Sequence, residues 1–221
     1  MNWSYRDRRH AGQILADELI ELKEWFNPLI LAIPNGGVAV AAPIAERLNA
    51  QLDILIVRKL QIPYNPEAGF GALTSLGTMI LNDDLVKRIG LSKIDIVAVR
   101  DQTLRQIENR KEAYSGLAAI EDPQGRDVIL VDDGLASGFT MVAALESVKM
   151  AEPAGITVAV PTSSGSAAPR VEPLVDHLVC PRIESGFVFA VANAYENWYD
   201  VPDSEVIELL HSFHNDEKQL A

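Results

Sequence analysis

Short runs of consecutive apolar residues recur along this chain, separated by stretches with helical character. The runs are too short for buried helices and lack the alternation of a half-exposed strand, so they predict strands buried on both faces. They lie at 29–33, 53–57, 128–131, 156–160 and 175–180. Strands and helices that alternate in this way favour an α/β fold, a mainly parallel sheet with helices on both faces.

The stretches between these runs carry helical signals. Residues 10–26 place apolar side chains on one helical stripe and acidic side chains on the opposite face. Ser92 is a good N-cap for a long helix, whereas Pro43 is compatible with a helix only in its first turn. We therefore expect helices at 10–26, 38–48, 92–115 and 140–150, and a last helix with Asp203 as its N-cap.

Two segments are expected to interrupt this order. Residues 58–69 contain Pro63 and Pro66 and are predicted to form a loop, followed by two short strands within 70–81. The residues after Cys180 lose the strand–helix alternation and hold several aromatic side chains, which indicates a small additional unit.

The chain length of 221 residues suits a single domain. We expect its core at about 28–180 and a small C-terminal hood at about 181–221, with residues 1–27 as candidates to join the hood.

Composition and charge argue against several classes of protein. The formal net charge of −12 disfavours binding to nucleic acid, whose phosphates repel an acidic surface. No apolar stretch reaches the ~18 residues that a membrane-spanning helix requires, and the basic first residues lack the apolar segment of a secretory signal. Cys180 is the only cysteine, which excludes an intramolecular disulfide and fits a reducing compartment. We therefore expect a cytoplasmic enzyme or small-molecule binder.

The segment 128–140, VILVDDGLASGFT, places two adjacent acids between an apolar run and a loop of small residues. In parallel α/β sheets, ligands bind beyond the carboxyl ends of the strands, where this loop should lie. Backbone N–H groups at the start of the next helix attract an anion. Gly134 and Gly138 allow close approach of the backbone, and Ser137 and Thr140 add hydroxyl donors. The loop is therefore a candidate phosphate site.

The two acids would repel a phosphate unless they face another group. Vicinal hydroxyls that donate to Asp132 and Asp133, or a bridging divalent cation, would remove this conflict. A diol close to a monophosphate describes a ribose 5-phosphate unit. In the alternative interpretation, the acids only cap the turn and the glycines only build it. A P-loop is disfavoured because Phe139 stands where a lysine is required, and the glycines are spaced too widely for a dinucleotide-binding fingerprint.

The same thirteen residues resemble the phosphoribosyl-pyrophosphate (PRPP) signature of the type I phosphoribosyltransferases. The rest of the chain resembles a group of stand-alone bacterial predicted phosphoribosyltransferases, and the match extends over about residues 5–210. The stretches that carry this resemblance are DRRHAGQILADEL, IPNGGV, RKL, NPEAGFGAL and ENWYDVPDSEV. The resemblance implies the type I phosphoribosyltransferase fold, with a C-terminal hood.

The resemblance also implies a role for each residue of the site. Asp132 and Asp133 would hold the ribose hydroxyls near Mg²⁺, while Arg58 and Lys59 would contact the pyrophosphate. The turn after the first strand, often built in this family with a non-proline cis peptide, would expose N–H groups to the pyrophosphate. The residues implied to bind PRPP are Asp132, Asp133, Gly134, Leu135, Ala136, Ser137, Gly138 and Thr140, and those of the pyrophosphate loop are Asn35, Gly36 and Gly37.

The implied activity is a Mg²⁺-dependent transfer of 5-phosphoribosyl from PRPP to a small acceptor, a nucleobase or an amine, with release of pyrophosphate. Positioning and charge stabilisation would lower the barrier to an oxocarbenium-like transition state. Residues 61–69 would close over the site, and the hood would grip the acceptor. The implied partners are PRPP, the acceptor and a second copy in a homodimer, without nucleic acid or membrane.

Asn35 keeps a second hypothesis open. Relatives usually carry arginine or lysine there, so asparagine removes a positive charge on the leaving-group side. The chain could therefore be a non-catalytic sensor or regulator that binds PRPP or a nucleotide with the same fold. Ala136 stands where some purine-specific members carry an acid, so the sequence identifies no general base.

Some other side chains allow two interpretations. Arg8 and Arg9 either form surface ion pairs or reach a phosphate. Trp198 and Tyr199 either pack the hood or stack on an acceptor base. The pair His211 and His214, with Glu208, either marks a polar helix end or offers a metal-binding face, and Cys180 is expected in the core.

Overall fold

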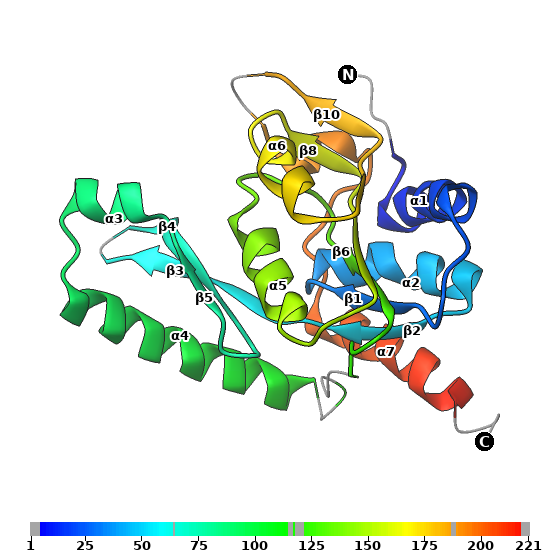
Figure 1. Ribbon diagram of the computed structural model, residues 1–221, viewed down its shortest axis with the longest axis horizontal. Helices are drawn as coiled ribbons and strands as arrows, with labels where there is room; N and C mark the ends of the chain where they lie inside the picture. The colour runs from blue at the N-terminus through cyan, green and yellow to red at the C-terminus, as the bar shows by residue number, and fades with distance from the viewer. Residues whose placement is uncertain (1–4, 64, 115–116, 118–121, 187–188, 218–221) are drawn as a thin grey trace.

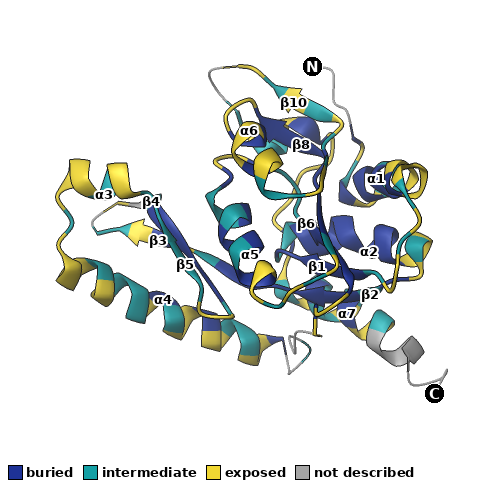
Figure 2. Cartoon of the chain, viewed as in Figure 1, coloured by how far each residue is buried: buried dark blue, intermediate teal, exposed yellow. Residues whose placement is uncertain are grey.

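The apolar runs form one parallel sheet, as the sequence predicts. The structure, a computed structural model, describes residues 5–63, 65–114, 117, 122–186 and 189–217, with only the backbone at 66–67 and 214–217. The strands of the sheet are β1 (Leu29–Ala32), β2 (Gln51–Ile54), β6 (Asp127–Val131), β7 (Gly155–Ala159) and β9 (His177–Val179), in the order β2-β1-β6-β7-β9. Their pairings are all parallel. The sheet is largely buried (Figure 2).

Helices cover both faces of this sheet, which confirms the predicted α/β fold (Figure 1). Alternate side chains of a strand point to opposite faces, and Ile30 and Ala32 accordingly pack in one apolar cluster, whereas Leu29 and Leu31 pack in another. The first cluster includes α1 (Arg8–Leu22), α2 (Gly36–Leu48) and α7 (Asp203–Glu217), and the second includes α5 (Phe139–Lys149). No helix in the described part of the chain is long and apolar enough to cross a membrane.

The position of Pro43 differs from the prediction. α2 begins at Gly36, so Pro43 lies inside the helix rather than in its first turn. α1 packs closely at this point: a Cβ on Gly12 would lie 2.2 Å from the Val40 carbonyl oxygen and 2.5 Å from Pro43 Cγ. We attribute the tolerance of the proline to this helix–helix contact, because tertiary packing outweighs intrinsic helix propensity.

The predicted loop at 58–69 is wrong, because these residues belong to a second sheet. β3 (Val57–Ile62), β4 (Asn65–Thr74) and β5 (Met79–Leu81) are antiparallel. Pro63 lies in the turn between β3 and β4, and Pro66 lies at the irregular start of β4, where a proline disturbs little pairing. Residues 61–63 and 65–69 therefore belong to the end of the β3–β4 hairpin. The apolar run 53–57 is also shared between β2 and β3.

This second sheet carries two helices, α3 (Asp83–Ile89) and α4 (Lys93–Ala113). We call residues 57–113 the arm, because they project from the central sheet in Figure 1. Ser92 caps α4 as predicted: its Oγ accepts from Asp95 N (3.2 Å), and Asp95 Oδ2 accepts from Ser92 N (2.9 Å). The predicted end of this helix at Ser115 lies outside the described residues. α3 was not predicted.

The C-terminal part contains short elements that the sequence pattern did not predict. β8 (Thr162–Ser164) pairs with β10 (Arg182–Glu184), and α6 (Ala168–Val171), η1 (Glu172–Leu174) and η2 (Val191–Ala194) are each about one turn long. The N-terminal segment joins this region, since Tyr5 N donates to Ala194 O (3.0 Å). α7 begins at Asp203 itself, so that residue is the first of the helix rather than its cap.

Candidate functional site

The loops that leave β1 and β6 start side by side. Ala32 pairs with Val131, so the turn at 34–37 lies next to the acid pair that follows β6. In the sheet β1 is flanked by β2 and β6, and the strand order changes direction between β1 and β6. Ligands of open α/β sheets bind at such a switch point. A cavity of about 470 Å³ opens here, lined by Asn35, Gly36, Asp132, Asp133, Thr140 and the hood residues Val191, Trp198 and Asp200, among others.

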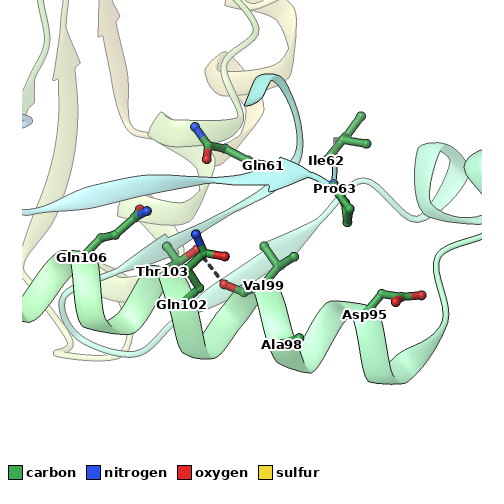
Figure 3. A pocket seen from close by; sticks show the side chains of 9 residues that line it. All are labelled: Gln61, Ile62, Pro63, Asp95, Ala98, Val99, Gln102, Thr103 and Gln106. Atoms are coloured by element: carbon green, nitrogen blue, oxygen red, sulfur yellow. Dashed lines mark hydrogen bonds between the residues drawn. The ribbon is translucent and has the colours of Figure 1, made fainter. Parts of the chain in front are cut away.

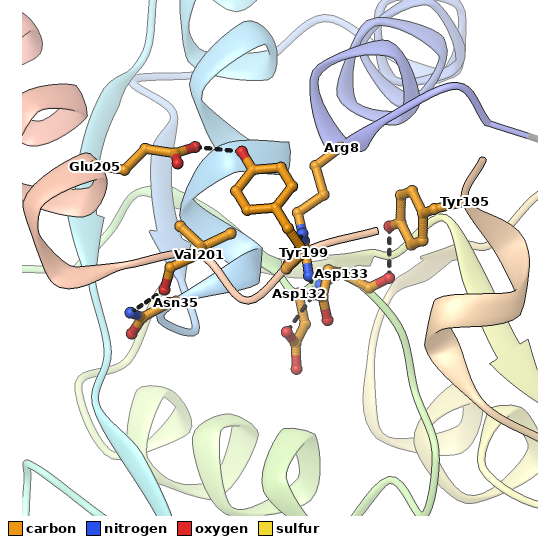
Figure 4. Close-up of polar contacts among 8 residues, drawn as sticks. All are labelled: Arg8, Asn35, Asp132, Asp133, Tyr195, Tyr199, Val201 and Glu205. Atoms are coloured by element: carbon orange, nitrogen blue, oxygen red, sulfur yellow. Dashed lines mark hydrogen bonds and ion pairs between the residues drawn. The ribbon is translucent and has the colours of Figure 1, made fainter. Parts of the chain in front are cut away.

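The acid pair lines this cavity, and Figure 4 shows its polar contacts. Asp132 Oδ1 accepts from the backbone N of Asp133 (2.8 Å), and Asp133 Oδ2 accepts from Arg8 Nε (2.9 Å). Burial raises the pKa of Asp132 well above its usual range, and the adjacent Asp133 charge adds to this rise. Burial also raises the pKa of Asp133, against the opposing effect of Arg8. A bound cation or hydrogen-bond donor would therefore be needed to favour the ionised form of the two carboxyls.

Arg8 lines the cavity, whereas the sequence allowed either a surface ion pair or a contact with a phosphate. Its side chain is 4% exposed, and its guanidinium lies 4.0 Å from the centre of the Trp198 ring. Nη1 donates to Tyr199 O (2.8 Å), which ties α1 to the hood. The neighbouring Arg9 instead forms an exposed pair with Glu46. Asp7 could have signalled this difference, since it caps α1 through His10 N (2.8 Å) and fixes the face on which Arg8 lies.

The loop 134–140 leads into the N-terminus of α5. Gly138 is the N-cap of α5 and has a φ of +79°, a conformation that favours glycine. Because glycine has no side chain, it makes no side-chain cap to the N–H groups of the first turn of α5. Ala136 and Ser137 are exposed, and Thr140 lines the cavity. Leu135 turns inward instead: its N donates to Thr162 O (2.9 Å), so this N–H is not directed to a ligand.

Arg170 is a cation at this loop that sequence reasoning missed. It lies on α6, donates through Nη1 to Ser137 O, and its guanidinium lies 4.4 Å from the centre of the Phe139 ring. No motif in the sequence links position 170 to the loop, because the contact depends on how α6 packs against α5.

The turn at 34–37 contains a cis peptide between Pro34 and Asn35, the feature that the resemblance implied. Gly36 lies directly on the acid pair, since a Cβ there would lie 1.9 Å from Asp133 Oδ2. Gly37 fits as closely against the backbone, with a Cβ 2.8 Å from Val131 O. Both glycines are therefore required for the close approach of this turn to the carboxyl end of β6.

The Asn35 side chain points toward other segments of the protein. Its Nδ2 donates to Val201 O (2.7 Å) and to Asp203 Oδ1 (2.8 Å), and its Oδ1 accepts from Tyr114 Oη (2.9 Å) and from Arg110 Nη2. The amide thereby links the turn to α4 and α7. Asn35 lines the cavity, and both donor hydrogens of its amide have partners within the protein.

Arg58 and Lys59 lie on opposite faces of the arm sheet, because successive residues of a strand alternate. Arg58 interacts electrostatically with Arg110 and Tyr114 at the end of α4 and with Asp203 at the start of α7. Lys59 lies on the other face, and its side chain fills the space above Gly69. Only Arg58 is thus grouped with residues that contact the turn at 34–37.

The remaining candidates lie apart from the cavity or have structural partners. Trp198 packs on Arg8 and lines the cavity, while Tyr199 Oη donates to Glu205 Oε1 (2.7 Å). Cys180 is half-buried, and burial raises the pKa of its thiol to about 11. His211 is exposed on α7; the side chain of His214 and the hood residue Phe187 lie outside the described residues. Within the described ranges, no group of three or more His, Cys, Asp or Glu could hold a metal ion.

A second cavity, of about 360 Å³, lies in the arm between the β3–β4 hairpin end and α4 (Figure 3). Among the residues that the structure describes, its lining includes Gln61, Gln102 and Gln106, and Asp95 is the only charged side chain. Asp95 is already engaged in capping α4. Without a cation, this cavity is a poor site for a phosphate.

We expect Gly36→Ala to destabilise the protein. The added methyl would overlap the Asp133 carboxylate and approach Arg8 Nε to 3.0 Å, so the ion pair must move. Overpacking of this kind costs about 1–3 kcal/mol, which lowers the unfolding midpoint by about 2–4 °C per kcal/mol for a chain of this size. Thermal unfolding followed by circular dichroism measures the effect.

Gly155→Ala is the control, because a Cβ there comes no closer than 3.2 Å to another atom, Asp127 Oδ1, and the φ of Gly155 is not left-handed. An unfolding midpoint of Gly36→Ala equal to that of the wild type would show that the turn and the acid pair are not packed as described.

Comparison with known proteins shows what this chain is similar to. The family model "Phosphoribosyl transferase domain" matches residues 8–196. Two curated relatives from Mycobacterium tuberculosis, strains CDC 1551 and H37Rv, are each named "Putative phosphoribosyl transferase" and are 34% identical over 212 residues. These matches cover 96% of this chain but 47% of each relative, so the chain spans about half the length of the curated relatives it matches.

Two solved structures are also similar to this chain. The crystal structure of TT1426 from Thermus thermophilus is similar with a TM-score of 0.80 at 34% identity, covering 95% of this chain and 98% of that one. The structure of the AQ2163 protein from Aquifex aeolicus has a TM-score of 0.52 at 10% identity, covering 80% of this chain and 74% of that one, and shares the fold alone.

Proposed function

Because this chain belongs to the phosphoribosyl transferase domain family, we propose that it binds PRPP and transfers the 5-phosphoribosyl group to a small acceptor with release of pyrophosphate. One observation carries the proposal: the acid pair, the loop 134–140 and the turn 34–37 meet in a single cavity at the switch point of the sheet. A ribose 5-phosphate unit needs the first two of these, and a pyrophosphate group needs the third. The acceptor is a nucleobase or an amine.

The acid pair fits the Mg²⁺ that this family implies. Mg²⁺ is usually held by one or two carboxylates together with phosphate oxygens of the substrate. Asp132 and Asp133 offer two carboxylates in the lining of the cavity. When bound, the ion neutralises charge on the pyrophosphate and so favours its departure.

The residues of the chain would act mainly by positioning. The loop 134–140 and the first turn of α5 would hold the 5′-phosphate through backbone N–H groups, with Ser137 and Thr140 hydroxyls beside them. Asp132 and Asp133 would accept hydrogen bonds from the ribose hydroxyls, and Arg8 would orient Asp133. Arg58 would offset negative charge on the leaving group in an oxocarbenium-like transition state.

Pyrophosphate release tests this proposal. Purified protein with PRPP and Mg²⁺ is assayed against a panel of nucleobases and primary amines, and we expect release with at least one acceptor. Saturable PRPP binding without turnover on any acceptor would contradict the transferase and favour the second candidate below.

The second candidate is a sensor or regulator that binds PRPP or a nucleotide without catalysis. The hydrogen bonding of Asn35 favours it, since position 35 places neither a charge nor a free amide at the leaving group. An arginine at this position would break four hydrogen bonds, so we expect Asn35→Arg to lower rather than raise any turnover. For either candidate we propose that the protein is a cytoplasmic homodimer. Analytical ultracentrifugation tests the oligomeric state.

A further inference from the structure

The hydrogen-bonded group around Asn35 gathers polar side chains from three segments, two of them charged. Arg110 lies on α4 of the arm, Asp203 begins α7, and Asn35 belongs to the turn at the cavity. Arg110 Nη2 contacts both Asn35 Oδ1 and Asp203 Oδ1, the latter at 2.8 Å. Arg110 Nε donates to Tyr114 Oη (2.8 Å), and Tyr114 is fully buried. The guanidinium is thus fixed one side chain away from the cavity.

A second guanidinium lies beside it with no counterion of its own. Arg58 makes no hydrogen bond or ion pair with any residue that the structure describes. Burial lowers the pKa of Arg58, and the like charge of Arg110 lowers it further. Two arginines therefore share one carboxylate, Asp203, which leaves an excess of positive charge in a partly buried place.

The N-terminus of α2, the positive end of its helix dipole, lies in the same region. Asn35 precedes this helix and makes no side-chain cap to it, because its amide is used by α4 and α7. The dipole of α2, whose N-terminus lies beside Arg110, adds to the attraction of this region for a multiply charged anion. An arginine fork offers several N–H donors to phosphate oxygens in a fixed geometry.

We propose that Arg110, held by Tyr114 and Asp203, is a binding residue for the pyrophosphate group and supplies there the positive charge that Asn35 lacks. This rests on the proposed function, since the anion is the leaving group of PRPP. Arg110 belongs to the arm, which the sequence did not connect to the site. Tyr114 and Asp203 are positioning residues: they hold the guanidinium at the turn without contacting the ligand themselves.

Calorimetric titrations with two halves of the substrate test the inference. Inorganic pyrophosphate with Mg²⁺, and ribose 5-phosphate separately, are titrated into wild type, Arg110→Gln, Arg110→Lys and the control Arg105→Gln. Arg105 lies on the same helix and is exposed, so its substitution removes the same charge away from the turn. Loss of charge-assisted hydrogen bonds should weaken pyrophosphate binding of Arg110→Gln at least about tenfold. Ribose 5-phosphate binding should not change, and Arg110→Lys should be intermediate.

Asp203→Asn separates a binding role from a merely structural one. The amide of Asp203→Asn keeps an oxygen that accepts from Arg110, so the guanidinium stays in position, while the negative charge that competes with the anion is removed. We therefore expect tighter pyrophosphate binding, by about threefold or more. If Arg110 only fixed the arm, loosening its ion pair would leave that affinity unchanged or weaken it, and this result would overturn the inference. Circular dichroism confirms that each variant is folded.

The outcomes also separate this inference from the proposed function. Wild-type protein that binds neither ribose 5-phosphate nor pyrophosphate contradicts both. Wild-type protein that binds both ligands, with pyrophosphate binding of folded Arg110→Gln equal to that of the wild type, contradicts only the role of Arg110. Weakening of both ligands to the same extent in Arg110→Gln would also contradict it, because the residue would then act on the fold and not on the anion.

Discussion

Asp132→Asn is expected to stabilise the ligand-free protein while severely weakening its binding of PRPP. The folded protein holds Asp132 beside Asp133 with Arg8 as the nearby cation, and burial raises the pKa of Asp132 well above its usual range. An amide of the same shape removes this incompletely compensated charge, a change worth about 1 kcal/mol or more. The same substitution removes an acceptor for the ribose hydroxyls, worth about 1.5–3 kcal/mol for each charge-assisted hydrogen bond.

The sign of the pH dependence follows from the raised pKa. A carboxyl with a raised folded-state pKa stabilises the folded state fully below its unfolded pKa of about 3.9, and this contribution is lost as pH rises through the folded pKa. We therefore expect the stability advantage of Asp132→Asn over the wild type to be larger at pH 8 than at pH 5. PRPP with Mg²⁺ should reverse the order, since only the wild type gains stability from the ligand.

Thermal unfolding at several pH values, with and without PRPP and Mg²⁺, measures both effects. Asp17→Asn is the matched control: it makes the same change in net charge at an exposed ion pair with Arg47, where little change in stability is expected. If Asp132→Asn lowered the midpoint at pH 8 without ligand, the interpretation of the acid pair as electrostatically strained would be wrong.

Arg8→Gln should be the most destabilising of these substitutions. Arg8 is buried against Trp198, donates to Tyr199 O and neutralises Asp133 at 2.9 Å. Removal of one partner from a buried ion pair costs about 3–5 kcal/mol, or an unfolding midpoint lower by at least about 6 °C. Arg9→Gln is the control, because that pair with Glu46 is exposed on both sides and 3.3 Å long.

The cost of Arg8→Gln should depend on pH. Arg8 opposes the rise in the pKa of Asp133, so its loss raises that pKa further. Protonation then relieves the unpaired charge, and the deficit should be smaller at pH 5 than at pH 8. Arg8→Gln combined with Asp133→Asn should recover part of the loss. Strictly additive losses in this double-mutant cycle would mean that the two side chains are not coupled.

The central sheet was predictable because its strands are buried on both faces and therefore consist of continuous apolar runs. Leu29–Ala32 and Val128–Val131 are fully buried, and no polar requirement interrupts them. The acid pair and the loop 134–140 were predictable for a related reason, since a local motif builds them from consecutive residues. Ser92 likewise signalled the start of α4 through contacts within four residues.

The arm and the long-range contacts of the site were not predictable by the same reasoning. Two prolines within 58–69 indicated a loop, yet Pro63 lies in a turn and Pro66 at an irregular strand start, where both are tolerated. Arg8 lies 125 positions from Asp133, and Arg110 lies 75 positions from Asn35. Their pairing depends on how α1 and α4 pack, for which the sequence carries no local signal.

Competition between PRPP and its two halves tests the central claim most directly. PRPP with Mg²⁺ is titrated into wild-type protein alone, then with saturating ribose 5-phosphate, and then with saturating pyrophosphate. We predict one saturable site per chain, blocked by either competitor, because we propose that this cavity binds the ribose 5-phosphate at Asp132–Thr140 and the pyrophosphate at the turn 34–37. Absence of PRPP binding, or binding that ribose 5-phosphate does not displace, would contradict the assignment of this cavity as the PRPP site.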